Sequence, residues 1–131
     1  MTRQEFTLIN SVLETEMREA GELWVNDWWM RSAEAQNALY RIGREQHPDG
    51  TWRITGSIVT NCDGYDKHSN HQAGCAVDKY FVKNGVIVYD CTKHPDIIEK
   101  YNKWHNRAVE LGLKPMIIFK DGSCDYPHFE G

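Results

Sequence analysis

Residues 95–112 carry the pattern that most restricts how this chain can fold. Apolar side chains recur there at alternating four- and three-residue steps, as along one face of an α-helix, at Ile97, Tyr101, Trp104, Ala108 and Leu111. Pro95 is favoured in the first turn of a helix, and Gly112 is typical of the residue that follows the last turn. The pattern predicts an amphipathic helix whose apolar face packs on the rest of the protein.

Two further helices are predicted from start and stop signals. Thr2 and Glu5 form a capping box before an apolar repeat that ends at Gly21. Ser32 can cap a second helix, which Gly43 closes. Strands are expected at residues 23–30, 53–60, 75–82, 86–90 and 116–119. Together these elements predict a small α+β fold in which helices pack on a central antiparallel sheet.

The connections between these elements are predicted from turn residues. Asn84 and Gly85 favour a tight hairpin turn between two of the strands, because both residues tolerate a positive φ. A turn is expected at residues 47–51, a polar loop at residues 61–74 and irregular chain after residue 123. Polar loops often carry functional side chains, so the loop at residues 61–74 is a candidate region.

Length, charge and cysteine spacing exclude several classes of protein. The 131 residues predict one domain, spanning residues 1–131, which we expect to act as a monomer. A net charge of −4 leaves no basic surplus for nucleic-acid binding. Residues 1–11 contain no apolar run, so we expect no signal peptide and no membrane insertion. We therefore expect the protein to be synthesised in the cytoplasm. The cysteines form no C-x-x-C pair and are expected to be buried, reduced thiols: Cys62, Cys75, Cys91 and Cys124.

Two separated segments contain residues that could bind a metal ion. His71 precedes Asp78 by seven residues across Gly74, and Asp125 precedes His128 by three residues across a proline. Two imidazoles and one carboxylate are a plausible zinc ligand set, and they leave the fourth position of a tetrahedral ion for water. The same spacing would also occur if these histidines and aspartates were ordinary solvated residues in polar loops, so spacing alone does not decide between the two interpretations.

The complete motifs resemble those of a known enzyme family. Residues 69–78 read S-x-H-x-x-G-x-A-x-D, and residues 125–129 read D-x-P-H-F. Upstream, residues 31–44 match R-S-x-x-x-Q-x-x-L-Y-x-x-G-R. The three blocks, in this order, resemble the zinc peptidases of peptidoglycan, namely the D-Ala-D-Ala carboxypeptidases and dipeptidases and the L-alanyl-D-glutamate endopeptidases of phage endolysins. The resemblance implies the hedgehog and D-Ala-D-Ala peptidase type of α+β fold, with the zinc site on its sheet.

The resemblance also implies a role for each matching residue. His71, Asp78 and His128 would bind one Zn²⁺, and Asp125 would be the general base. Arg31 would face the substrate and stabilise the oxyanion, because its guanidinium stays charged. Substrate contacts are expected from two further residues, Ser69 and Gln36.

The function implied is hydrolysis of peptidoglycan stem peptides, with the L-Ala–D-Glu endopeptidase reaction favoured by the upstream block. The alternative enzyme is a D,D- or L,D-carboxypeptidase. The alternative outside the enzymes is a peptidoglycan-binding or phage structural module with a vestigial metal site. No separate cell-wall-binding domain is expected, and a phage or prophage lysin would reach the cell wall or periplasm once released from the cytoplasm.

Several other residues have simpler interpretations. His68 lies outside the motif and is expected to be a solvated loop residue, and His105 is expected at the surface or partly buried. Trp24 and Trp104 are expected in the core.

The W-G-G sequence that endolysin-like members carry before the last block is absent here, because residues 114–119 have a different sequence at that place. The substrate groove beside that segment is therefore expected to differ.

Overall fold

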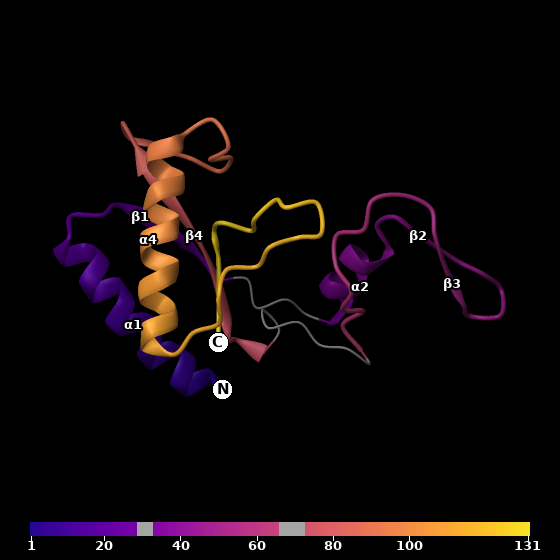
Figure 1. Cartoon of the computed structure of the whole chain (residues 1–131). Helices are drawn as coiled ribbons and strands as arrows, with labels where there is room; N and C mark the ends of the chain where they lie inside the picture. The colour runs from indigo at the N-terminus through magenta and orange to yellow at the C-terminus, as the bar shows by residue number, and fades with distance from the viewer. Residues whose placement is uncertain (29–32, 66–72) are drawn as a thin grey trace. The chain divides into compact units, whose positions relative to one another are not determined.

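Strand β4 (Ala76–Lys83) organises the larger part of this protein. The computed structural model describes residues 1–28, 33–65 and 73–131. The chain forms two compact units, of which unit 1 contains residues 1–28 and 74–131 and unit 2 contains residues 29–73. Helices and antiparallel strands occur in both units, so the α+β class predicted from the sequence is confirmed (Figure 1).

The sheet of unit 1 is built around β4. Strand β1 (Trp24–Asp27) pairs with it in antiparallel fashion on one side, with Asp27 opposite Asp78. Strand β6 (His128–Glu130) pairs with the beginning of β4, and β5 (Val86–Ile87) pairs with its end. The hairpin turn between β4 and β5 has φ values of 53° at Asn84 and 75° at Gly85, as the sequence predicts.

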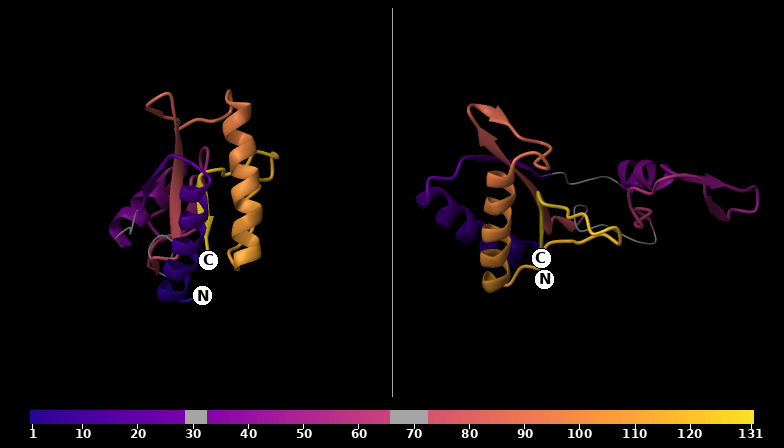
Figure 2. Two further views of the ribbon diagram at one scale, coloured as in Figure 1. Left: turned by 90° about the vertical axis from the view of Figure 1, so that its left-hand side faces the viewer. Right: turned by 45° about the horizontal axis from the view of Figure 1, so that its top comes forward.

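Two helices cover the apolar face of this sheet. Helix α1 spans Arg3–Glu19 and helix α4 spans Pro95–Leu111, close to the helices predicted from the sequence. Side chains of successive strand residues point to opposite faces, and the fully buried residues of β4 alternate accordingly. Figure 2 shows both helices beside this sheet. The resulting core includes Phe6, Leu13, Met17, Val77, Phe81, Ile97, Tyr101, Trp104, Ala108 and Phe129.

The predicted helix ends of unit 1 are confirmed in detail. The Thr2 hydroxyl oxygen accepts a hydrogen bond from the backbone N–H of Glu5 at 3.1 Å, as expected for an N-cap. Gly112 has a φ of 110°, and its N–H bonds back to the last turn of α4. Among the described residues, no helix combines the length and the apolar character needed to cross a membrane.

The described part of unit 2 includes helix α2 and a small hairpin. Helix α2 spans Ala33–Arg41, and strands β2 (Arg44–Gln46) and β3 (Trp52–Ile54) pair in antiparallel fashion. The predicted turn between the strands is present, since the His47 N–H donates to the Thr51 carbonyl at 2.8 Å. Gly43 has a φ of 76°, and a side chain there would collide with the backbone of Ser57. Only glycine therefore suits the junction between α2 and β2.

Several local predictions were wrong. Residues 116–119 do not form a buried strand, because only the single bridge between Ile118 and Cys124 forms, and Ile118 and Phe119 are 67% and 50% exposed. A local turn competes with strand formation there, since the Asp121 carboxylate accepts bonds from the Ser123 N–H and hydroxyl. Strands β3 and β5 are shorter than predicted, and β6 lies where irregular chain was expected.

The cysteine and tryptophan predictions are confirmed in part. None of the four cysteines, all of which the structure describes, forms a disulfide bond, but Cys62 and Cys124 are only partly buried. Trp104 lies in the core, whereas Trp24 is partly buried at its edge. Cys75, which lies within the motif at residues 69–78, is buried and packs in the core, as expected for a small apolar residue.

Candidate functional site

Asp78 and His128 lie directly opposite each other in unit 1, although 50 positions separate them in the sequence. Asp78 is the third residue of β4, and His128 is the first residue of β6. The antiparallel pairing of the two strands points both side chains to the face of the sheet that is turned away from the core. The Nδ1 atom of His128 and the Oδ1 atom of Asp78 are 3.2 Å apart.

This separation fits two donor atoms of one zinc ion. Zinc lies about 2.0–2.2 Å from nitrogen and oxygen ligands, and a tetrahedral angle then separates two donors by about 3.3–3.6 Å, close to the separation observed. The side chains of His128 and Asp78 are 9% and 19% exposed, so the pair is shielded but still reaches the surface. Asp78 and His128 therefore suit two positions of the predicted ligand set.

Asp125 precedes this pair on the turn that leads into β6. The backbone N–H of Asp125 donates to the carbonyl of Ile117, and its own carbonyl accepts from the N–H of His128. Burial raises the pKa of the Asp125 carboxyl, and the charges of Asp78 and Glu130 raise it further, while His128 opposes them. Asp125 is thus electrostatically coupled to both described members of the predicted ligand set.

Glu130 is a member of this cluster that the sequence analysis missed. Its Oε2 atom lies 3.0 Å from Nε2 of His128, so the imidazole has one carboxylate at each nitrogen. Burial disfavours the charged imidazole, but the hydrogen bonds to Asp78 and Glu130, together with the negative charges of Asp125 and Asp78, raise the pKa of His128 to about 9. In the sequence, the only sign of this contact is that Glu130 follows His128 by two residues, a spacing that puts both side chains on one face of a strand.

Helix α4 holds the backbone around the pair from the core side. The Tyr101 hydroxyl donates to the carbonyl of Lys79 at 2.7 Å, and the N–H of Lys79 donates to the carbonyl of Pro127 at 2.8 Å. One helical turn later, Nε2 of His105 lies 2.7 Å from the carbonyl of Tyr126. A carbonyl can only accept, so Nε2 carries the hydrogen. The turn between Asp125 and β6 is thereby linked to α4, directly at the Tyr126 carbonyl and through Lys79 at the Pro127 carbonyl.

His105 is more deeply buried than predicted. The ring stacks on Phe129 with centroids 3.9 Å apart, and burial lowers its pKa to about 4. The prediction of a surface or partly buried residue was wrong because the apolar period of residues 95–112 does not include this position. The neighbouring strand β6, which covers it, was itself not predicted.

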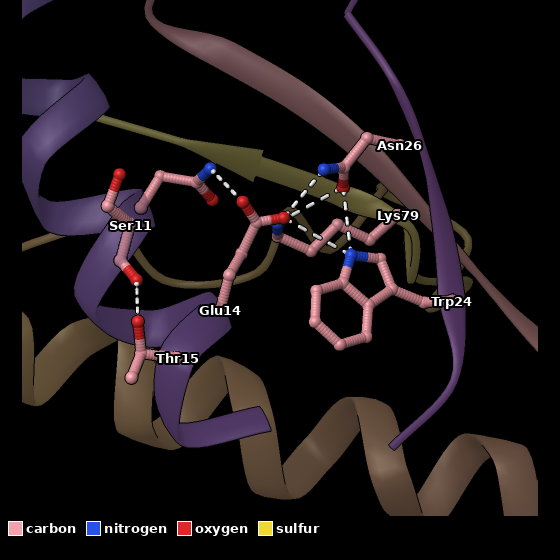
Figure 3. A network of polar contacts seen from close by, with 7 residues as sticks. Ser11, Glu14, Thr15, Trp24, Asn26 and Lys79 are labelled. Atoms are coloured by element: carbon pink, nitrogen blue, oxygen red, sulfur yellow. Dashed lines mark hydrogen bonds and ion pairs between the residues drawn. The ribbon is translucent and has the colours of Figure 1, made fainter. Parts of the chain in front are cut away.

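A buried ion pair lies on the core face of the same strand. The ammonium of Lys79 is fully buried and lies 3.0 Å from the carboxylate of Glu14 (Figure 3). Asn26 donates to the same carboxylate oxygen at 2.6 Å, and the indole N–H of Trp24 donates to it at 3.2 Å. Burial lowers the pKa of Lys79 to about 8, against the opposing effect of Glu14. The pair joins α1, β1 and β4 directly behind Asp78.

Three predicted site residues, Arg31, Ser69 and His71, lie outside the described residues, and so does His68. Gln36 is described and fully buried in unit 2. Its side-chain nitrogen donates to the Thr60 hydroxyl at 3.1 Å and to the Cys62 carbonyl at 2.9 Å. In residues 1–28, 33–65 and 73–131, no group of three or more His, Cys, Asp and Glu is placed to hold a metal ion.

Comparison with models of known protein families and with curated proteins finds no match for this chain. The assignment of a function therefore depends on the residues themselves and on the geometry around Asp78 and His128.

Proposed function

We propose that this protein is a zinc-dependent peptidase that hydrolyses peptidoglycan stem peptides between L-Ala and D-Glu. The observation that carries the proposal is the 3.2 Å approach of His128 Nδ1 to Asp78 Oδ1 across β4 and β6. The motifs assign these two residues to the zinc ligand set, and their separation suits adjacent positions on a tetrahedral ion. One Zn²⁺ would be held by His71, Asp78 and His128.

Each residue of the proposed site has a chemical task. Zinc, when bound, supplies an acidified water and polarises the scissile carbonyl. Asp125 accepts the proton of the attacking water and returns it to the leaving amine. Arg31 donates hydrogen bonds to the oxygen on which negative charge develops. Ser69 contacts the stem peptide, whereas Gln36, which is fully buried, orients its neighbours Thr60 and Cys62.

Mass spectrometry of digested peptidoglycan tests this function. We expect the intact chain, purified with one equivalent of zinc, to create new N-termini at D-Glu. Loss of a C-terminal residue from the stem instead would indicate a carboxypeptidase. Binding to peptidoglycan without any cleavage would indicate a binding or structural module with a vestigial metal site.

Two variants separate metal binding from catalysis. Asp125→Ala should retain zinc and lose hydrolysis by about 10²–10⁴-fold, because removing a general base leaves the metal ligands in place. His71→Ala should lose both zinc and hydrolysis. Glu99→Ala, on the exposed face of α4, is the control and should retain both. Wild-type hydrolysis by Asp125→Ala would remove the general-base assignment.

A further inference from the structure

The imidazole of His128 has a carboxylate oxygen within hydrogen-bond distance of each ring nitrogen. Asp78 Oδ1 lies 3.2 Å from Nδ1, and Glu130 Oε2 lies 3.0 Å from Nε2. A neutral imidazole carries a hydrogen on one nitrogen and offers the lone pair of the other to a metal. Zinc could therefore bind either Nδ1 together with Asp78 or Nε2 together with Glu130, but not both.

We propose that Glu130 is a positioning residue, which accepts a hydrogen bond from Nε2–H of His128 and so presents Nδ1 to the zinc ion beside Asp78. This inference rests on the proposed function. Zinc is thereby assigned to Nδ1 of His128 and to the carboxylate of Asp78. Glu130 does not bind the ion but orients the imidazole that does.

The fold holds Glu130 in place for this task through its backbone. The Glu130 carbonyl accepts a hydrogen bond from the N–H of Lys114 at 2.9 Å, and the following N–H, of Gly131, donates to the carbonyl of Cys75 at 2.9 Å. Glu130 also pairs with Ala76 across the sheet. Since none of these bonds uses the side chain, the carboxylate can be removed without detaching β6 from β4.

Burial makes the contact between Glu130 and His128 effective. The side chains of Glu130 and His128 are 16% and 9% exposed, so water competes weakly for the hydrogen bond between them. A carboxylate on the far nitrogen of a ligating histidine fixes the orientation of the ring and increases the basicity of the ligating nitrogen. Loss of such a partner typically weakens metal binding by about 10- to 100-fold.

The test combines zinc affinity with the protonation pattern of His128. Zinc affinity is measured by competition with a chromophoric chelator, and ¹⁵N–¹H NMR of the zinc-loaded chain identifies the nitrogen that carries hydrogen. In the wild type we expect zinc on Nδ1 and hydrogen on Nε2. Glu130→Ala should bind zinc about 10- to 100-fold more weakly. Glu130→Gln should stay closer to the wild type, because its amide oxygen can still accept the hydrogen bond.

The control is Glu99→Ala, which removes an exposed carboxylate from α4 and should leave zinc affinity unchanged. Zinc on Nε2 of the wild type, or wild-type affinity in Glu130→Ala, would overturn the role of Glu130 and leave the zinc peptidase proposal standing. A wild-type chain that binds no zinc would overturn both. If Glu130→Ala fails to fold, the NMR spectrum of the wild type still decides the inference.

Discussion

Unit 1 and unit 2 are stabilised by different interactions. Every buried apolar side chain among the described residues belongs to unit 1, where α1, α4 and the sheet share one core. Among residues 34, 36–65 and 73, whose burial is described in unit 2, the one buried side chain is that of Gln36. Burial of a large apolar side chain contributes about 1.5–3 kcal/mol, whereas a hydrogen bond contributes about 0.5–1.5 kcal/mol net.

Polar contacts to the backbone hold the described part of unit 2 together. Besides the two bonds from Gln36, the Arg44 guanidinium donates to the carbonyls of Tyr40 and Thr60 and lies 3.8 Å from the centre of the Tyr40 ring. Gln36, Tyr40 and Arg44 lie within residues 31–44, the first of the three sequence motifs. Because unit 1 buries apolar side chains and the described part of unit 2 depends on polar contacts, we expect unit 2 to open more readily than unit 1. Asp78 and His128 then lie in the more stable unit.

The largest effect is expected from truncating the core of unit 1. Phe81 is fully buried on β4 and packs edge to face on Tyr101, with ring centroids 4.9 Å apart. Phe81→Ala should lower the free energy of unfolding by about 3–5 kcal/mol, because it loses apolar burial and leaves a cavity. Urea denaturation followed by tryptophan fluorescence measures this loss. A loss below about 1 kcal/mol would contradict a core centred on β4.

Breaking the buried ion pair of unit 1 should lower the free energy of unfolding by a comparable amount, and a second substitution should restore part of it. Lys79→Met leaves the Glu14 carboxylate poorly compensated and should cost about 3–5 kcal/mol. Glu14→Gln combined with Lys79→Met should recover at least half of that loss, because no buried charge remains. The control is Lys83→Met, which removes an exposed ion pair with Asp96 and should cost less than about 1 kcal/mol. Equal stability of the single and double variants would show that charge is not the cause.

The sequence was sufficient for helices α1 and α4 but not for the short strands. Local signals define α1 and α4, since the Thr2 cap, the apolar period and Gly112 all lie within the segments they shape. Strand β6 has three residues, and its pairing with β4 spans about fifty positions, so no local pattern reports it. The opposite error occurred at residues 116–119, where a strand was predicted but Ile118 and Phe119 lie exposed beside a turn fixed by Asp121.

The same limit applies to the candidate site. The motifs identified Asp78 and His128, and the register of β4 and β6 brings them together. Glu130 could be recognised only after His128 was known to begin a strand, because the two-residue spacing is meaningless in irregular chain. His105 was misjudged for the related reason that its neighbours Tyr126 and Phe129 are distant in the sequence.

His105 should make unit 1 sensitive to acid. Its pKa is lowered from 6.5 to about 4 in the folded protein, mainly by burial. Unfolding therefore takes up a proton between these values, so the contribution of His105 to stability is complete above pH 6.5 and is lost as the pH falls to 4. The loss should approach about 3 kcal/mol at 1.36 kcal/mol per pKa unit.

The His105→Gln variant isolates this contribution to the acid sensitivity. Its amide can still donate to the Tyr126 carbonyl, but it does not titrate. We expect its free energy of unfolding, measured by urea denaturation at several pH values, to vary less with pH below 6.5 than that of the wild type. Other titrating groups near the ring, such as His128, are present in both proteins and cancel in the difference. Parallel pH profiles would contradict the assignment.

The smallest effect is expected in unit 2, from Gln36→Ala. This change leaves the Cys62 carbonyl and the Thr60 hydroxyl without the donor that joins them to α2, and should cost about 1–3 kcal/mol. Amide hydrogen exchange should accelerate at the described residues of unit 2 and stay unchanged in β4. Gln46→Ala is the matched control, because Gln46 is exposed and should cost no more than about 0.5 kcal/mol. If Gln36→Ala instead accelerates exchange equally in both units, they open as one cooperative body and the contrast between them fails.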